Sequence, residues 1–444
     1  MARQLGAVLV CLLGCGDNLA PPPTDLVADL STERALVLPA SRVLAIALTG
    51  IDDHRFLVAR ATAQGEDFCE ECLTADPTEC AATCRRAVLE VTRHRTDGPS
   101  DTPQRFLEVF PATRDHVLGA LQLVSLDEAH AGVAWLECDD AACGTGQPKR
   151  SCTARYTKVD LITGRPGTIA TLYEGWYGDL QLAFDQRTRR LLAVLGKQAP
   201  SRVGVRAAIF NELGGMRLGS WRSYGGAGAR APAAAASRGG FVIAADDPAP
   251  SVAALEEPCA DSCECSGPAP PSQITGGLFA FHPSPERAPE RIAPGRDVSG
   301  TYGAREAIAA IDAGGRVIVA SSQAKDGLAE LFEPAIGGWL RRHVSRAPVP
   351  LWLGALGDSR RLAWIGSEPD AQAPDVERLT AGVALIGELE QRGELTALEP
   401  GRVLQAAPAG VYSAVTTAYV LRRVSIPGGA PPERFEILAV RADW

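Results

Sequence analysis

Apolar and polar residues alternate along most of this chain, and one arrangement of the alternation recurs. A strand of small residues is followed by a turn containing Asp or Gly and then by a strand of β-branched or aromatic residues. Alternation with a period of two predicts β-strands rather than helices. Seven copies of this predicted hairpin begin at Arg42, Val117, Gly178, Ala229, Arg305, Pro350 and Val403.

Most copies are followed by a second predicted hairpin. Clear examples begin at Tyr156, Arg206, Gly277, Leu328 and Val383. Two hairpins make a four-stranded antiparallel unit, and the spacing of about 45 residues is that of a propeller blade. We therefore predict an all-β fold, a seven-bladed β-propeller of four-stranded antiparallel blades.

The alanine run Ala233–Ala236 tests this register, because alanine is the best helix former. Four alanines are too few to nucleate a helix alone. The repeat instead makes them an innermost strand, where blades converge and small side chains fit. Similar small residues recur at 307–310 and 406–409.

The two ends of the chain complement each other. The seventh repeat ends at the strand Arg434–Val440 and lacks a fourth strand, whereas Ala35–Pro39 is an unused strand before the first repeat. Because closure removes an exposed sheet edge, we predict that these two segments pair.

One turn carries a family resemblance. Asp160-Leu161-Ile162-Thr163-Gly164 resembles the D-L-x-T-G hairpin of bacterial quinoprotein-like and surface-layer propeller repeats. The rest of the chain shares only the strand pattern with them and with WD-repeat propellers. The resemblance implies the fold. Neither a quinone-cofactor motif nor a regular Trp-Asp signature repeats, so it implies no cofactor and no dehydrogenase activity.

The first residues are typical of an export signal. Arg3 precedes an apolar core from Leu5 to Leu13, which is too short to span a bilayer, since a span needs roughly 20 residues. Leu12-Leu13-Gly14-Cys15 resembles the lipobox of bacterial lipoproteins, which implies lipidation at Cys15. The alternative is a plain secretory signal cut nearby.

This interpretation divides the chain into a signal peptide at 1–14, a lipidated and proline-rich tether at 15–34, and the propeller at 35–444. Pro21-Pro22-Pro23 predicts a stiff spacer between lipid and folded body. In bacterial lipoproteins an Asp directly after the lipidated cysteine retains the protein on the inner membrane. Here that residue is Gly16, so the resemblance implies sorting to the outer membrane of the cell envelope.

Export changes the meaning of the cysteines, because thiols oxidise outside the cytosol. Of 12 cysteines, Cys11 leaves with the signal and Cys15 carries lipid, so ten remain. We expect them to form disulfides. The three groups hold four, three and three members, so complete pairing needs at least one bridge between the two odd groups: Cys69, Cys72, Cys80 and Cys84; Cys138, Cys143 and Cys152; Cys259, Cys263 and Cys265.

The first group suits nested bridges, Cys69 to Cys84 and Cys72 to Cys80. Its alternative is a tetrathiolate zinc site, because four cysteines at short spacings make a zinc ligand set. The oxidising compartment argues against zinc, and no HExxH motif or calcium-binding loop occurs, so we predict no metal.

Composition excludes several classes of protein. The chain has 444 residues, 46% hydrophobic and 22% charged, which excludes a disordered protein. The formal net charge of -9, without a basic run, argues against nucleic acid or an acidic lipid surface as a partner.

The cysteine groups lie in insertions near 61–84, 138–152 and 246–275, each between the second and third strands of a repeat. These connections share one face of a propeller. Loops on a rigid scaffold are common binding sites, although bridged insertions also protect against proteolysis. The candidate ligand-face residues are Asp139, Asp140, Asp246 and Asp247.

Catalytic candidates are weak, and we predict no catalytic residue. Gly357-Asp358-Ser359 lacks the leucine of a G-D-S lipase block, and no G-x-S-x-G motif occurs. Asp52-Asp53 and Glu256-Glu257 fit turns or surface. The six histidines hold no common place in the repeats: His54, His94, His116, His130, His282 and His343.

These features favour a monomeric, lipid-anchored binding or scaffold module for a protein, peptide or glycan of the envelope. The alternative is a periplasmic hydrolase or lyase with its site at the mouth of the propeller channel.

Overall fold

The structure is a computed structural model of the whole chain. It describes residues 29–39, 43–52, 54–63, 87–98, 104–108, 116–142, 148–176, 179–196, 204–226, 229–237, 240–247, 276–284, 286–295, 305–312, 317–323, 328–345, 349–355, 361–369, 377–385, 391–394, 401–408, 416–425 and 433–443. Every named element in these ranges is a β-strand, so the predicted all-β class is confirmed.

The described strands form seven four-stranded antiparallel sheets. Six follow chain order and the last one combines both ends of the chain. Their strands are β2 (Val43–Gly50), β3 (Arg55–Ala63), β4 (Ala87–Arg95) and β5 (Gln104–Glu108); β6 (His116–Asp127), β7 (His130–Ala142), β8 (Pro148–Asp160) and β9 (Ala170–Trp176); β10 (Asp179–Asp185), β11 (Arg190–Gly196), β12 (Val205–Asn211) and β13 (Arg222–Tyr224); β14 (Arg230–Ser237), β15 (Gly240–Asp247), β16 (Gly277–Ser284) and β17 (Glu286–Pro294); β18 (Arg305–Asp312), β19 (Val317–Gln323), β20 (Leu328–Ala335) and β21 (Gly338–Ser345); β22 (Val349–Ala355), β23 (Arg361–Pro369), β24 (Glu377–Leu385) and β25 (Gln391–Glu394); β26 (Gly401–Pro408), β27 (Thr416–Ser425), β28 (Glu433–Asp443) and β1 (Asp29–Pro39).

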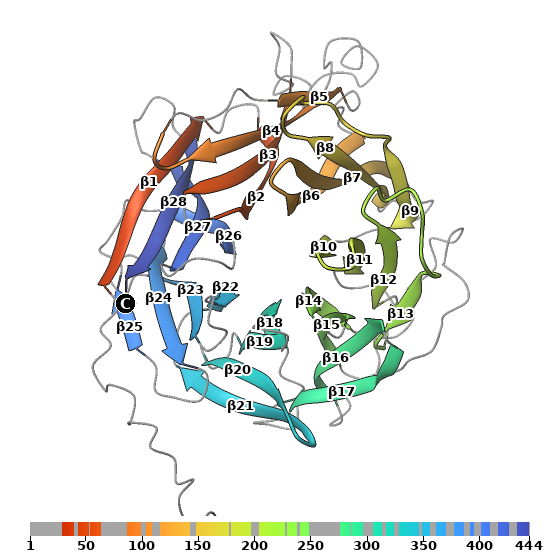
Figure 1. Cartoon of the computed structure of the whole chain (residues 1–444). Coiled ribbons are helices and arrows are strands. Elements are labelled where there is room, and N and C mark those ends of the chain that lie inside the picture. The colour runs from red at the N-terminus through yellow and green to blue at the C-terminus, as the bar shows by residue number, and fades with distance from the viewer. Residues whose placement is uncertain are drawn as a thin grey trace, which may run out of the picture.

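The sheets stand around a central axis (Figure 1). Each innermost strand contacts the innermost strand of the next sheet, from β2 through β6, β10, β14, β18 and β22 to β26, and β26 contacts β2 again. The predicted hairpins coincide with the first two strands of these sheets. The alanine run lies in β14, as predicted, where Ala233 and Ala235 are buried.

The core is divided into layers between neighbouring sheets. Between the sheets β2–β5 and β6–β9, Leu57 and Leu89 pack against Val133 and the fully buried Trp135. Equivalent layers follow between later sheets. Burial of apolar surface contributes about 25 cal/mol per Å², so each layer couples its two sheets.

The pairing of β1 with β28 was predicted correctly, but it is longer than predicted. It runs from Asp29 opposite Asp443 to Pro39 opposite Arg434, with an irregularity between Arg34 and Leu36. The strand therefore begins six residues before the predicted Ala35. Asp29–Arg34 lacks apolar alternation, and its strand conformation comes from pairing with β28.

A buried carboxylate lies in this closing sheet. Glu436 of β28 is 0% exposed and Arg422 of β27 is 2% exposed. Arg422 Nε donates to Glu436 Oε2 at 3.0 Å and Arg434 Nε donates to Oε1 at 2.8 Å. Arg34 Nε of β1 lies 3.3 Å from Glu436 Oε1, so these side chains join the three strands β1, β27 and β28.

These contacts determine the ionisation of Glu436. Burial opposes the charged form, but the hydrogen bonds from Arg422 and Arg434 and the charge of Arg34 outweigh it and lower the pKa. A lowered folded pKa means that the stabilisation is present above the unfolded pKa of about 4.3 and is lost as the pH falls through the folded pKa.

The insertions between second and third strands lie where they were predicted, at the connections β3–β4, β7–β8 and β15–β16. The second is mostly strand rather than loop. Here β7 continues to Ala142 and β8 begins at Pro148, with Asp140 opposite Arg150. Consecutive aspartates disfavour strands, but the ladder overrides that preference.

We predict that Glu436→Gln lowers the free energy of unfolding by about 3–5 kcal/mol, because it removes the buried carboxylate to which Arg422 and Arg434 donate. Urea unfolding followed by tryptophan fluorescence measures this. The matched control is Glu33→Gln in β1, whose exposed carboxylate lies 3.7 Å from Arg441 and whose loss should cost below about 0.5 kcal/mol. Equal effects of the two variants would contradict the account.

Candidate functional site

Most of the cysteines that are predicted to carry a lipid or to form disulfides lie outside the described residues: Cys15, Cys69, Cys72, Cys80, Cys84, Cys143, Cys259, Cys263 and Cys265. The exceptions are Cys138 and Cys152, which face each other across β7 and β8. Cys152 is buried. Within the described ranges, no three His, Cys, Asp or Glu side chains are grouped to hold a metal.

The four candidate ligand-face aspartates do not form one site. Asp139 and Asp140 lie near the end of β7, and Asp246 and Asp247 lie at the end of β15, in two sheets separated by β10–β13. The side chains of Asp246 and Asp247 are completely buried. Asp247 Oδ2 accepts the N–H of Gly226 at 2.8 Å, so this carboxylate supports a neighbouring loop rather than facing a ligand.

A cavity lies elsewhere in the ring. A cavity of about 590 Å³ lies between the sheets β14–β17 and β18–β21. Its apolar wall comes from Phe241 and Val242 of β15, Val317 of β19 and Trp339 of β21. Strand ends and hairpin turns of two sheets therefore build it together.

Four polar side chains line the same cavity: Ser237, His282, Arg287 and Glu290. Trp339 Nε1 donates to Glu290 Oε2 at 3.0 Å, and the partly buried indole ring both packs against the core and lines the cavity. His282 Nε2 lies 3.4 Å from Glu290 Oε1, is itself buried and makes no hydrogen bond with the described residues. The arrangement offers donors and acceptors beside an aromatic surface.

Electrostatics make this cavity close to neutral. Burial lowers the pKa of His282, against the opposing effect of the Glu290 charge, so the imidazole is uncharged at neutral pH. The charges of Arg287 and Glu290 have opposite sign. The lining thus favours neither a cation nor an anion.

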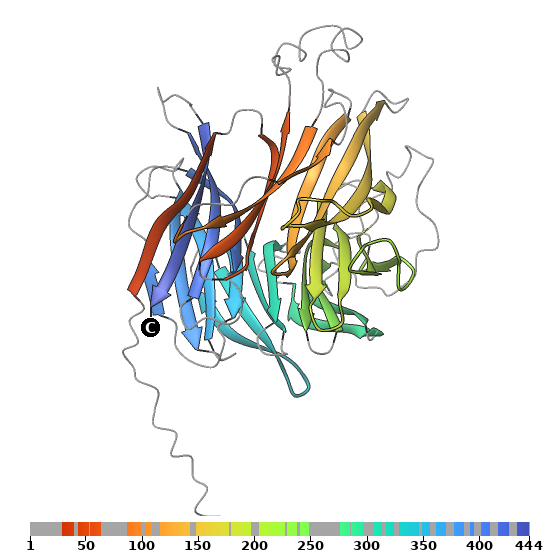
Figure 2. The ribbon, with the colours of Figure 1, turned by 45° about the horizontal axis from the view of Figure 1, so that its top comes forward.

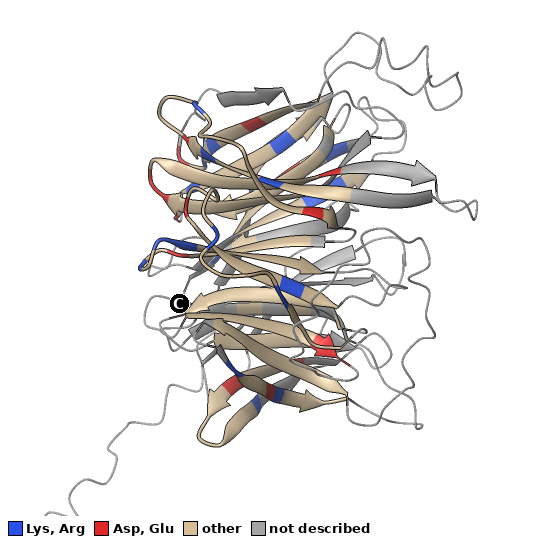
Figure 3. Ribbon diagram, turned by 90° about the vertical axis from the view of Figure 1, so that its right-hand side faces the viewer, with Lys and Arg blue, Asp and Glu red and all other residues tan. Residues whose placement is uncertain are grey.

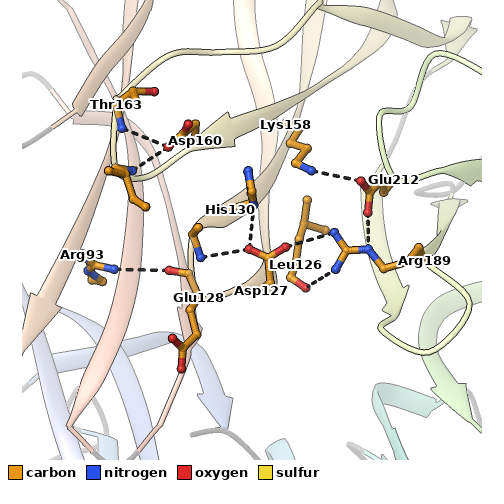
Figure 4. A network of polar contacts seen from close by, with 12 residues as sticks. Arg93, Leu126, Asp127, Glu128, His130, Lys158, Asp160, Thr163, Arg189 and Glu212 are labelled. Carbon is orange, nitrogen blue, oxygen red and sulfur yellow. Dashed lines mark hydrogen bonds and ion pairs between the residues drawn. The ribbon is translucent and has the colours of Figure 1, made fainter.

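A second polar cluster joins the sheets β6–β9 and β10–β13 (Figure 4). Arg189, in the β10–β11 turn, contacts Glu212 through Nε and lies 3.1 Å from Asp127 Oδ2 through Nη2. Lys158 Nζ lies 3.1 Å from Glu212 Oε1. His130 Nδ1 lies 2.7 Å from Asp127 Oδ1.

The backbone around this cluster has positive φ angles at two residues, Arg189 and Gly214. Arg189 has a φ of 54°, the one positive value outside glycine among the described residues. Tyr156 Oη donates to the carbonyl of Glu212 at 2.8 Å. Its ring contacts Gly214, where a Cβ would lie 2.3 Å from Cδ1 and where φ is +69°, so only glycine fits there.

The cluster is held ionised. Partial burial opposes the charge of Asp127, but hydrogen bonds from His130 and Arg189 outweigh it and lower its pKa. The pKa of Glu212 is lowered in the same way by Arg189 and Lys158. Neither acid is available as a proton donor near neutral pH, so the cluster acts as a link between sheets.

The other residues that the sequence singled out either stabilise turns or lie outside the described residues. Asp52 Oδ1 accepts the N–H groups of His54 and Arg55 and so caps a turn. In the D-L-x-T-G turn, Asp160 Oδ1 accepts the N–H groups of Ile162 and Thr163. The segments 357–359 and 256–257 lie outside the described residues.

Sequence reasoning missed the cavity and the cluster. Each brings together residues that are distant in sequence, such as Ser237 and Trp339, or Asp127 and Glu212. The only local signal was the Gly337-Gly338-Trp339 turn, in which an aromatic residue follows two glycines.

Comparison with known proteins gives likeness of fold without a family. No family model and no curated protein matches the chain. The WD40 domain of Toxoplasma gondii coronin has a TM-score of 0.48 at 11% identity, covering 94% of this chain and 87% of that one. An oligogalacturonate lyase from Vibrio parahaemolyticus has a TM-score of 0.46 at 11% identity, and the match covers 94% of this chain and 97% of the lyase. A Dyadobacter fermentans protein of unknown function has a TM-score of 0.46 at 10% identity, and the match covers 93% of this chain and 99% of that protein.

Identities this low carry no function over to the chain. The sheets and their ring of contacts show a β-propeller architecture by themselves.

We predict that Arg189→Met lowers the free energy of unfolding by about 1 kcal/mol, because it removes two partly exposed ion pairs. The loss should shrink at high salt, where such pairs are screened, and as the pH falls through the lowered pKa values of Asp127 and Glu212. Arg187→Met, at an exposed position of the same turn, is the control and should have no measurable effect. A salt-independent loss would contradict the ion-pair explanation.

Proposed function

We propose that this chain is a lipid-anchored β-propeller of the bacterial cell envelope, favouring the outer membrane, that binds a protein, peptide or glycan as a monomeric binding or scaffold module. Its seven described sheets are then the complete set of blades. Residues 1–14 are the signal peptide, Cys15 carries the lipid, and the tether ends where β1 begins at Asp29. Among the described residues no helix is long and apolar enough to cross a membrane.

The observation that carries a binding function is the cavity between the sheets β14–β17 and β18–β21. At about 590 Å³, it falls within the range of roughly 300–1,000 Å³ that is usual for small-ligand pockets. Its aromatic wall and its few convergent polar groups are the composition expected of such a pocket.

Of the candidate ligands, a neutral glycan suits this lining best. The apolar C–H face of a sugar ring can lie on Trp339, whose N–H is already bound to Glu290. Sugar hydroxyls donate and accept, so they can satisfy a carboxylate, a guanidinium and a neutral imidazole together. A charged ligand would leave either Arg287 or Glu290 opposed by a like charge.

The Arg189 cluster supplies no general acid for the alternative hydrolase or lyase. Channel-mouth catalysis needs ionisable groups free to exchange protons. The acids gathered in the Arg189 cluster are bound to Arg189, Lys158 and His130 and have lowered pKa values.

We also propose that the insertions are cross-linked by disulfides. Cys138 and Cys152 are directly opposed on β7 and β8, so a bridge between them fits the ladder. Cys143 is then left to pair with the group at Cys259, in keeping with the odd count of each group.

The lipid anchor is tested by Cys15→Ser. We expect the variant to move from the membrane fraction to the soluble fraction, because it lacks a fatty chain worth roughly 0.8 kcal/mol per buried methylene. Fractionation with immunoblotting measures the change. Membrane association identical to that of the native chain would refute lipidation.

The glycan site is tested by calorimetric titration of the full chain, in a detergent without a sugar headgroup, with cellobiose, maltose, lactose and N,N′-diacetylchitobiose. We expect at least one to bind saturably. Trp339→Ala should weaken that binding about tenfold or more, a change of about 1.4 kcal/mol, whereas Trp339→Phe should retain most of it.

Two controls sharpen this test. Ile336→Ser changes a fully exposed neighbour that does not line the cavity, and it should leave binding unchanged. Digalacturonate, a charged disaccharide, should bind more weakly than its neutral counterparts. If no neutral disaccharide binds, the glycan proposal is wrong, and cleavage of a bound one would favour the hydrolase or lyase.

A further inference from the structure

Exposed apolar side chains gather on one face of the ring. In consecutive antiparallel strands, the turns from first to second and from third to fourth strand lie at the same end of a sheet. We call this end the hairpin face; the insertions between second and third strands lie at the other end. Figure 3 views the ring from the side, with short turns and the C-terminus toward the left.

Seven of the eight large apolar residues that are exposed in the described part of the chain belong to third-to-fourth-strand hairpins or their flanks. The most exposed are Ile162, Leu213, Met216 and Ile336, which we call the apolar tips. They come from three sheets, β6–β9, β10–β13 and β18–β21. Single exposed apolar residues are common, but a set confined to one face indicates an apolar surface that this face contacts.

The chain enters the ring on the same face. The third strand of the closing sheet, β28, ends at the hairpin face with Asp443, and Asp29 is opposite Asp443. The segment that leads back to Cys15 therefore joins the body beside the hairpin face. Figure 2 shows the C-terminus and the β20–β21 turn at the same end of the molecule.

The polar residues of these turns fit a surface of lipid headgroups. Three acids of the turns β8–β9, β10–β11 and β12–β13 make contacts within the protein: Asp160 caps its own turn, Asp185 accepts from the N–H of Arg187, and Glu212 is paired with Arg189 and Lys158. Exposed arginines remain in the same turns, at Arg165, Arg187 and Arg217. Apolar residues flanked by arginine are typical of segments that lie at a membrane interface.

We propose that the hairpin face rests on the bilayer that holds the lipid of Cys15, with the apolar tips in the interface and the turn arginines at lipid phosphates. This inference rests on the proposed lipid anchor. Between Cys15 and Asp29 an extended chain reaches at most about 50 Å, so the tether alone does not impose contact. The apolar tips supply the reason for contact with the bilayer. The net charge of -9 belongs to the whole chain and does not describe this face.

The orientation has a consequence for binding. The insertion face then points away from the membrane. The cavity, whose lining includes Ser237 at the end of β14 and Pro334 in β20, lies near the membrane side.

The experiment uses the full lipidated chain reconstituted in vesicles of phosphatidylethanolamine and phosphatidylglycerol. An environment-sensitive fluorescent amino acid replaces Ile336, Ile162 or, as the matched control, Val37. Val37 is also an exposed apolar residue, but it lies near the other end of β1. Nitroxide-labelled lipids then report which probe lies in the interface.

We expect quenching and a blue shift at positions 336 and 162, and neither at position 37. Chains that sediment with the vesicles but show no quenching at 336 and 162 would refute the docking while leaving the anchor intact. Quenching at 37 alone would show the opposite orientation. Failure to sediment would refute the anchor, and the docking with it.

Discussion

Pairing of the first strand with the last is the interaction on which the rest of the structure depends. The last sheet of the ring has its fourth strand only because β1 comes from the other end of the chain and covers the edge of β28. The buried Glu436, bonded to Arg422 and Arg434 and close to Arg34, gives this contact a specific register. Removing the carboxylate of Glu436 takes away the acceptor that these three strands share.

Closure of the ring by β1 also determines which features lie on each face of the ring. Because β1 runs from the hairpin face to the insertion face, an anchor before Asp29 is attached beside the short turns. The same face carries the Arg189 cluster, which links two sheets through paired charges, and the apolar tips. The proposed anchor and the proposed docking surface thus lie on the same face of the ring.

The fold was largely predictable because its signals are local and repeated. Period-two alternation located the hairpins, and the small residues of 233–236 located an innermost strand. Where pairing with another strand overrode local preference, prediction failed. Asp29–Arg34 and Cys138–Ala142 show no apolar alternation, yet both extend strands because a partner is present.

The candidate sites were much less predictable, since they depend on which turns become neighbours in space. Asp246 and Asp247 were candidate ligand-face residues, but both are buried, and Asp247 accepts the N–H of Gly226. The cavity combines Phe241, His282 and Trp339 from three strands of two sheets. No spacing in the sequence states that these side chains meet, and the positive φ of Arg189 has no local signal at all.

Hydrogen–deuterium exchange in β1 tests the closed ring most directly. If β1 completes the last sheet, its amides bonded to β28 should be protected and should exchange together with those of β28 in one cooperative opening. Amides of β1 that exchange at the rate of an unfolded chain while β28 stays protected would contradict the account.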